Sequence, residues 1–171
     1  MSGGRAVDGP GRYVIQLHDA TSLHFDLRLE VDGVLRSWAV PRGLSLDPRL
    51  RRLAMRVDDH ELAHGAFEGV LPDAPRGSGA VIVWDHGLHL PLGEGPVAQA
   101  LDRGHAAFRL DGIKLVGGWA LTRVAPGPRE RWIVVKMRDE HADPERDIVA
   151  ERPESVVSGR TIAELAAGRG R

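Results

Sequence analysis

Residues 23–31 alternate between apolar and charged side chains, as expected for a β-strand with one apolar face and one polar face. The polar face carries His24, Asp26 and Arg28 at successive positions about 6.6 Å apart, and His18 precedes the strand. Two imidazoles and a carboxylate suit Mn²⁺, Fe²⁺ or Zn²⁺, and a neighbouring guanidinium suits a phosphate group. The pattern predicts a metal site of His18, His24 and Asp26 with Arg28 beside it. A polar strand face with unrelated histidines is the simpler alternative.

A second group of ionisable residues follows in the segment 52–60. Four of them have the same parity and would share a face if one strand ran through them: Arg52, Arg56, Asp58 and His60. A carboxylate beside His60 would hold its imidazole in one tautomer, as a general acid or a phosphate-binding group requires. A solvent-exposed histidine at a strand end is the alternative. His64 lies four residues further on, but this spacing has meaning only on a helix and Gly65 follows at once.

The composition restricts the class of protein. The chain has 171 residues, 42% of them hydrophobic, which suits one domain with a core. It contains no cysteine, which excludes disulfides and thiolate metal sites. A net charge of −1 excludes a globally basic nucleic-acid binder, so contact with a polyanion requires a local basic patch. We find no apolar signal segment and no stretch approaching 18 apolar residues, and therefore expect a cytoplasmic protein without a membrane contact.

Short apolar runs separated by turn residues predict a protein made mainly of strands. The expected strands are residues 12–18, 23–31, 34–40, 53–57, 80–85, 107–110, 113–116, 119–124 and 132–137. Asp32-Gly33 and Asp111-Gly112 are each typical of a two-residue hairpin turn. Many short strands with such turns favour an antiparallel barrel or sandwich.

Helices are expected only at residues 97–103 and 161–167. Thr161 and Glu164 have the spacing of a capping box at the start of the second helix. We expect three segments along the chain. They are a flexible stretch at 1–11, the β-domain at 12–138, and a charged tail at 139–171 whose short helix packs on the β-domain or trails it.

Four stretches of the chain resemble the phosphoesterase module of bacterial ligase D, the multifunctional enzyme of non-homologous end joining. They are HDATSLHFDLRLEVDGVLRSWAVPRG from residue 18, RRLAMRVDDHELAHGAFEGVLP from residue 51, GSGAVIVWDHG from residue 77 and RDEHADPERDIVAERPESVVSGRTIAEL from residue 138. The resemblance covers residues 12–167. It implies a small antiparallel β-barrel with one or two short helices, and an Mn²⁺-dependent enzyme that heals DNA 3′ ends. Such an enzyme removes a 3′-terminal ribonucleoside and then the remaining 3′-phosphate, leaving a 3′-hydroxyl.

The resemblance also implies roles for individual residues. The metal ligands are His18, His24 and Asp26. The catalytic residues are Arg28, Arg52, Asp58 and His60. The phosphate-binding residues are Gln16, Arg28, Arg42, Arg52, His60 and His64. Arg42 stands where the family usually has Lys, and His64 stands where Tyr is common. Residues 73–76 also depart from the family's usual sequence.

The same resemblance implies DNA or RNA–DNA 3′ ends as binding partners, together with separate ligase, polymerase and end-binding proteins of end joining. No polymerase or ligase domain accompanies the module, so we expect a stand-alone, monomeric form. Two other functions remain open. A 2-His-1-carboxylate Fe(II) oxygenase uses the same ligand types, although its lone histidine usually lies far downstream. A DNA-end-binding module of the same fold without catalytic activity is the second alternative.

Overall fold

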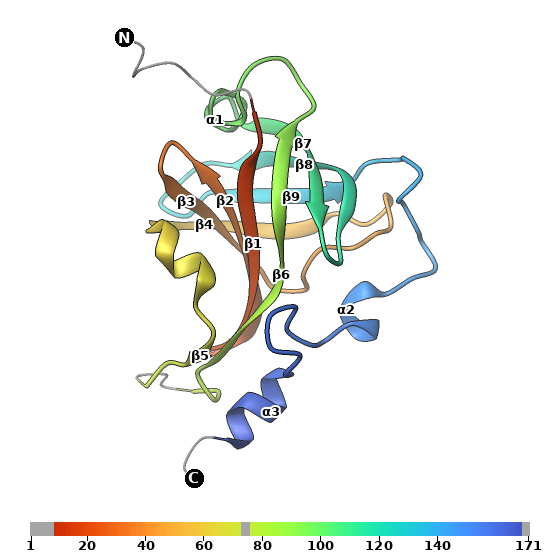
Figure 1. Ribbon diagram of the computed structural model, residues 1–171. Helices are drawn as coiled ribbons and strands as arrows, with labels where there is room; N and C mark the ends of the chain where they lie inside the picture. The colour runs from red at the N-terminus through yellow and green to blue at the C-terminus, as the bar shows by residue number, and fades with distance from the viewer. Residues whose placement is uncertain (1–8, 73–75, 169–171) are drawn as a thin grey trace.

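The computed structural model describes residues 9–72 and 76–168, in which the strands close into an antiparallel barrel (Figure 1). The strand order is β1-β2-β3-β4-β9-β8-β7-β6-β5, and pairing of β1 with β6 closes the ring, leaving β5 as an extra strand beside β6. The strands are β1 (Gly11–Asp19), β2 (Leu23–Val31), β3 (Val34–Val40), β4 (Arg52–His60), β5 (Gly69–Val70), β6 (Ala80–Pro91), β7 (His105–Gly112), β8 (Val116–Ala125) and β9 (Arg131–Lys136). The predicted β-barrel is confirmed.

Helices are few and short in the described residues. They are the 3₁₀ turn η1 (Leu62–Ala66) and the helices α1 (Val97–Asp102), α2 (Ile148–Glu151) and α3 (Ile162–Ala167). The capping box of α3 is present as predicted, with Thr161 and Glu164 each bonded to the other's backbone N–H. No helix within residues 9–72 and 76–168 is long and apolar enough to cross a membrane.

The apolar face of each strand lines the interior of the barrel. Leu27 and Leu29 of β2 are fully buried there. All four tryptophans, at 0–2% exposure, belong to the same core: Trp38, Trp84, Trp119 and Trp132. Burial of such large side chains contributes strongly to the hydrophobic stabilisation of a small barrel. Because the interior is filled, a functional site must lie on the outer surface or at an end of the barrel.

The hairpin predicted at Asp32-Gly33 is confirmed. Val31 pairs with Val34 across the turn, and both turn residues have positive φ, 52° for Asp32 and 83° for Gly33. This is the backbone geometry that a two-residue turn of type I′ requires. The turn fixes the register of β2 against β3, which places Arg28 opposite Ser37.

The hairpin predicted at Asp111-Gly112 is wrong, because both residues belong to β7 and the turn lies at residues 113–115. Fully buried Asp85 holds this turn. Its carboxylate accepts hydrogen bonds from the backbone N–H groups of Ile113, Lys114 and Leu115. Gly112 is required for a different reason, since a Cβ there would lie 1.7 Å from the Tyr13 hydroxyl oxygen. A distant carboxylate has overridden a local turn signal.

Strand β6 is longer than predicted and continues to Pro91. Its second half lacks an alternating pattern, but it pairs with β1 on one side and β7 on the other. A Cβ at Gly87 would lie 2.1 Å from the Asp111 carbonyl oxygen, so close backbone approach requires glycine there. At the start of the chain, β1 begins at Gly11, within the stretch predicted to be flexible. Residues 1–8 of that stretch, and residues 73–75, lie outside the described part.

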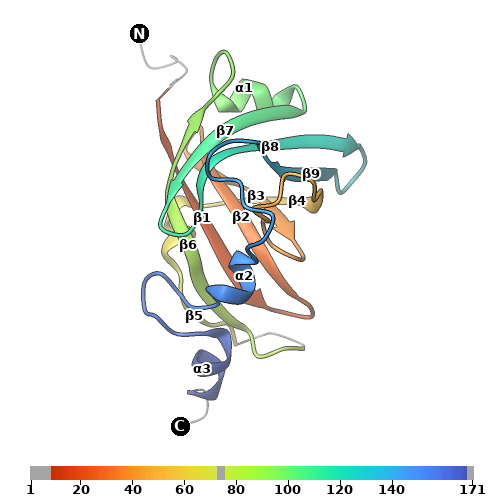
Figure 2. The same cartoon turned by 90° about the vertical axis from the view of Figure 1, so that its right-hand side faces the viewer.

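The tail from residue 139 packs against the barrel wall (Figure 2). Ile148 of α2 is buried in the core. The Arg152 carbonyl accepts hydrogen bonds from Trp84 Nε1 at 2.7 Å and from Lys114 Nζ at 2.8 Å. Val156 N donates to the carbonyl of Val83 in β6 at 3.0 Å. These contacts hold the tail against β6 and the β7–β8 turn.

Candidate metal and phosphate centre

The three predicted metal ligands lie together on the outer face of β1 and β2. His18 and His24 are direct cross-strand partners, and Asp26 is the next residue of that face along β2. One ligand atom from each of the three lies within 4.8 Å of the other two. His24 Nε2 is 3.2 Å from Asp26 Oδ1, and His18 Nδ1 is 3.9 Å from Asp26 Oδ2. Imidazole nitrogen and carboxylate oxygen at these separations can converge on one divalent cation.

The hydrogen bonding of the histidines fits a metal site. His24 Nδ1 lies 3.0 Å from the Ser22 carbonyl oxygen, which only accepts, so Nδ1 carries the hydrogen and Nε2 faces Asp26. Metal-binding histidines usually have this second contact to a carbonyl. Burial and the neighbouring His24 lower the pKa of His18, which favours the neutral imidazole that a metal needs. The hydrogen bond with Asp26 raises the pKa of His24, and a cation would compete for this Nε2 position.

Arg28 is buried next to Asp26 and organises the polar face. Its side chain is 5% exposed, and burial lowers its pKa from the usual value. Nε donates to Gln16 Oε1 at 2.7 Å and Nη1 donates to Ser37 Oγ at 2.8 Å. Nη2 lies 3.4 Å from Asp26 Oδ2. These partners, one on each of three strands, fix the plane of the guanidinium beside the candidate metal ligands.

Two imidazoles approach the remaining N–H groups of Arg28. His60 Nδ1 is 3.0 Å from Nη1, and His64 Nε2 is 3.4 Å from Nη2. The two rings also contact each other, with 4.5 Å between their centroids. A guanidinium has five N–H groups, and five side chains contact it in this cluster: Gln16, Asp26, Ser37, His60 and His64.

His60 reaches this face because β4 contains a bulge. Leu35 of β3 pairs with His60, whereas Ser37 pairs with Val57, so three steps along β4 match two along β3. An extra residue in one strand reverses which face the following side chains occupy. The prediction that His60 shares a face with Arg56 was therefore wrong, since a regular strand was assumed.

The Nδ1 atom of His60 has two neighbours that require different protonation states. It lies 3.0 Å from the Asp58 carbonyl oxygen, which only accepts, and 3.0 Å from Arg28 Nη1, which only donates. With a hydrogen on Nδ1 the ring donates to Asp58. Without it the ring accepts from Arg28 and carries its hydrogen on Nε2. The backbone of β4 thus influences the tautomer of His60.

His64 is brought to the cluster by the 3₁₀ turn η1, which contacts the outer face of β1 and β3. The Gln16 side-chain amide donates to the carbonyls of His64 and Phe67 at 2.9 and 3.0 Å, which fastens η1 to β1. The His64 ring stacks on the ring of Phe67, with 6.1 Å between centroids. Burial and the Arg28 guanidinium lower the pKa of His64. Gln16 therefore positions two members of the cluster, Arg28 and His64.

Three other predicted site residues are placed differently. Arg52 has the same parity in β4 as core residue Ala54, and its Nε is buried without a hydrogen-bond partner in the described residues. Asp58 contacts His60 through its carbonyl oxygen, and its residue is exposed at the bulge. Arg42 is exposed in the turn after β3, beyond the last pair of Phe25 with Val40. Participation of these three side chains stays a prediction.

Two members of the cluster were not predicted from the sequence. Ser37 is fully buried and accepts from Arg28, and Phe67 stacks on His64. For Ser37 a signal existed, because the Asp32-Gly33 hairpin sets its pairing with Arg28. For Phe67 no signal existed, since η1 has no periodic pattern.

A family model described as the DNA ligase D 3′-phosphoesterase domain matches residues 16–123, which include the whole cluster. The chain belongs to this family. The match runs from Gln16 in β1 to Arg123 in β8 and includes the segments that form the polar outer face. A multifunctional non-homologous end joining protein LigD of Pseudomonas aeruginosa is 47% identical over 154 residues, which are 88% of this chain and 18% of that protein. A LigD protein of Mycobacterium tuberculosis is 35% identical over 139 residues, which are 80% of this chain and 17% of that protein. The chain spans less than a fifth of the length of these relatives.

Proposed function

We propose that the protein is a metal-dependent phosphoesterase that heals DNA 3′ ends during double-strand break repair. It removes a 3′-terminal ribonucleoside, which leaves a 3′-phosphate, and then removes that phosphate to leave a 3′-hydroxyl. One observation carries this proposal: a candidate metal site and a buried guanidinium with two imidazoles lie side by side on one outer face of the sheet. Family membership supports DNA or RNA–DNA 3′ ends as the substrate, and separate ligase, polymerase and end-binding proteins as partners.

His18, His24 and Asp26 would hold the metal. Imidazole and carboxylate ligands without a thiolate suit Mn²⁺. When bound, the cation supplies Lewis-acid polarisation of a phosphoryl oxygen. Asp26 also contacts Arg28, so the carboxylate couples the position of the guanidinium to that of the metal ligands.

Arg28 is suited to bind the phosphoryl group through two N–H groups. Three of its N–H groups are occupied by Gln16, Ser37 and Asp26, which keep the guanidinium in place. The other two, one on Nη1 and one on Nη2, face the imidazoles of His60 and His64. A phosphate placed there accepts both in a bidentate arrangement, and the two rings turn toward the same oxygens. The fixed positive charge then stabilises the negative charge that develops in the transition state.

His60 is the proton donor of this proposal. As an imidazolium it donates Nδ1–H to the Asp58 carbonyl and presents Nε2–H to the leaving oxygen. His64 supplies a neutral N–H to a phosphoryl oxygen, as a phenol would. Its lowered pKa keeps the ring neutral at pH 7.

A labelled primer-template that ends in one 3′-ribonucleotide tests the proposal. With Mn²⁺ we expect loss of the ribonucleoside followed by loss of the 3′-phosphate, and no product without a divalent metal. Tight binding of the end with no processing under any metal would instead support the non-catalytic end-binding alternative. Dependence on iron and 2-oxoglutarate would support an oxygenase, which no feature of the cluster beyond the three ligands favours.

A further inference from the structure

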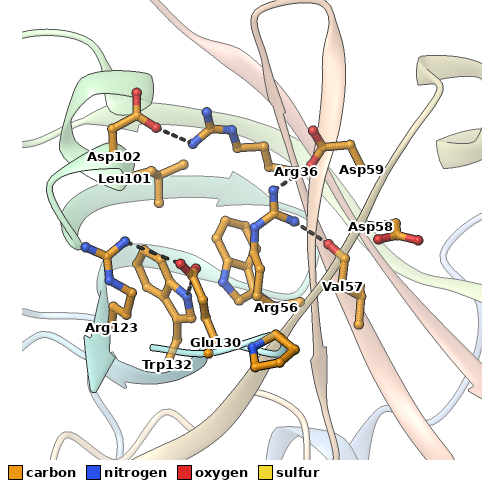
Figure 3. Close-up of a pocket in the computed structure, with 13 residues that line it drawn as sticks. Arg36, Arg56, Val57, Asp58, Asp59, Leu101, Asp102, Arg123, Glu130 and Trp132 are labelled. Atoms are coloured by element: carbon orange, nitrogen blue, oxygen red, sulfur yellow. Dashed lines mark hydrogen bonds and ion pairs between the residues drawn. The ribbon is translucent and has the colours of Figure 1, made fainter. Parts of the chain in front are cut away.

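A charged pocket lies on the core side of β3 and β4, where Trp38 and Trp132 help to line it (Figure 3). His18, His24 and Asp26 lie on the outer face of β1 and β2. The volume of the pocket is about 520 Å³. Three arginines line it, and each is paired with a carboxylate. Arg36 Nη1 lies 3.0 Å from Asp102 Oδ1, Arg56 Nη2 lies 2.6 Å from Asp59 Oδ1, and Arg123 Nη1 lies 3.6 Å from Glu130 Oε2. The three cations are thus already neutralised, which argues against an anion site.

Arg56 differs from the other two arginines because it also contacts the backbone of the bulge. Its Nη1 donates to the carbonyl of Ser37 at 3.1 Å and to the carbonyl of Val57. Ser37 and Val57 form the last regular pair before the bulge. Its Nη2 binds Asp59, which lies within the bulge, and its guanidinium carbon lies 5.3 Å from the centre of the Trp38 ring. Figure 3 shows Arg56 reaching Val57 and Asp59 from the pocket side.

We propose that Arg56 is a positioning residue for His60. It holds the bulge of β4 in the conformation that turns His60 onto the outer face, next to Arg28. The proposal rests on the proposed function only for its effect on rate, because the placement of His60 can be measured without substrate.

Backbone hydrogen bonding gives the physical reason. A bulge interrupts the ladder and leaves backbone groups of the bulged strand unpaired. The Arg56 guanidinium gives charge-assisted hydrogen bonds to two carbonyls at the edge of the bulge, those of Ser37 and Val57. Without Arg56 a regular pairing of β3 with β4 competes, and a shift of one residue would turn His60 to the opposite face.

Ser37 of β3 connects the pocket side of the sheet with its outer face. The Ser37 carbonyl accepts from Arg56 on the pocket side, while the Ser37 hydroxyl accepts from Arg28 on the outer side. Loss of Arg56 therefore disturbs both the neighbour that binds Arg28 and the carbonyl of Asp58 that faces His60 Nδ1. Within the described residues, the side chains of Arg36 and Arg123 make no hydrogen bond to Ser37 or Val57, so these two arginines serve as matched controls.

The experiment compares Arg56→Met with Arg36→Met and Arg123→Met in the full chain. Each variant removes one ion-paired arginine from the same pocket. Ring ¹⁵N NMR shifts of His60 in the metal-free protein report which ring nitrogen carries hydrogen, with the His60→Gln variant providing the assignment. We expect these shifts to change only in Arg56→Met. We also expect kcat for 3′-phosphate release to fall by about 10- to 100-fold in this variant, because a displacement of about 1 Å can cost that much, with less change in KM.

Unchanged His60 shifts in a folded Arg56→Met protein would overturn the proposal. Losses of rate in all three variants that simply follow their losses of melting temperature would overturn it as well. If Arg56→Met does not fold, Asp59→Asn decides, since it removes one anchor of Arg56 at a side chain that is 44% exposed. Its His60 shifts should move, with a loss of rate of up to about fivefold, and unmoved shifts would again overturn the proposal. If the parent shows no 3′-end activity, the proposed function fails while the NMR comparison still tests the positioning role.

Discussion

Replacement of Arg28 by Lys keeps the positive charge and removes the planar guanidinium. Lys has one ammonium, which cannot reach Gln16, Ser37 and Asp26 while also facing a phosphate in the position between the two imidazoles. The variant should lose about two charge-assisted hydrogen bonds to the phosphoryl group, each contributing about 1.5–3 kcal/mol. The sum of about 3–6 kcal/mol corresponds to a loss of about 10²- to 10⁴-fold in kcat/KM.

The assay is release of inorganic phosphate from a 3′-phosphorylated primer-template at saturating Mn²⁺. Arg109→Lys is a matched control, because Arg109 is 40% exposed on β7 and pairs with Asp111. We expect the control to stay within about twofold of the parent, as is usual for an exposed ion pair. An Arg28→Lys protein with more than half of the parent activity would refute the assignment of Arg28 as a bidentate phosphate ligand.

Three further predictions concern the metal, the pH dependence and the stability. Mn²⁺ should support phosphate release while Zn²⁺ inhibits it, since Zn²⁺ prefers a closed four-coordinate site; a full rate with Mg²⁺ alone would contradict this. Burial and Arg28 lower the pKa of His64 below 6.5. The rate ratio of parent to His64→Tyr should therefore stay constant above pH 6.5 and change only below it, and a ratio that changes between pH 7 and 9 would be inconsistent with this. Burial alone would raise the pKa of Asp139, but hydrogen bonds from Lys136, Gly118 N and His141 N lower it to about 2. The stabilisation by the Asp139 carboxylate is fully present above pH 3.8 and is lost as pH falls toward 2. The free energy of unfolding of Asp139→Asn should therefore be about 1–2 kcal/mol lower than that of the parent at pH 7, after discounting for partial exposure. At pH 2 the two proteins should be nearly equal in stability. Urea unfolding at both pH values measures this, and an equal difference at both would refute it.

The grouping of His18, His24 and Asp26 was predictable from the sequence because strand periodicity is local, whereas their role as metal ligands stays a prediction. The alternation in residues 23–31 identified the polar face, and the Asp32-Gly33 turn fixed the register of its neighbour β3. His18 needed only an antiparallel partner to lie opposite His24.

The bulge and the β7–β8 turn were not predictable because they depend on distant groups. The parity of residues 52–60 predicted one shared face for Arg56 and His60. A bulge separates the two residues onto opposite faces, and hydrogen bonds from the Arg56 side chain to the backbone of β3 and β4 accompany that bulge. Asp85 lies 26 positions before Asp111 and displaces the turn from Asp111-Gly112. His64 and Phe67 reach the cluster through η1, whose position depends on bonds from Gln16 that no short window of sequence contains.

The central claim is that the outer face of β1 and β2 is a metal-dependent phosphoesterase centre. The most direct test is phosphate release from a 3′-phosphorylated primer-template as Mn²⁺ is added to metal-free protein, with the parent and Asp26→Asn measured side by side. The parent should have no activity without metal and a saturable rate with it. Asp26→Asn should stay folded, as judged by its circular dichroism, and show no response to Mn²⁺. Full activity of the metal-free parent, or an equal Mn²⁺ response in folded Asp26→Asn, would contradict the claim.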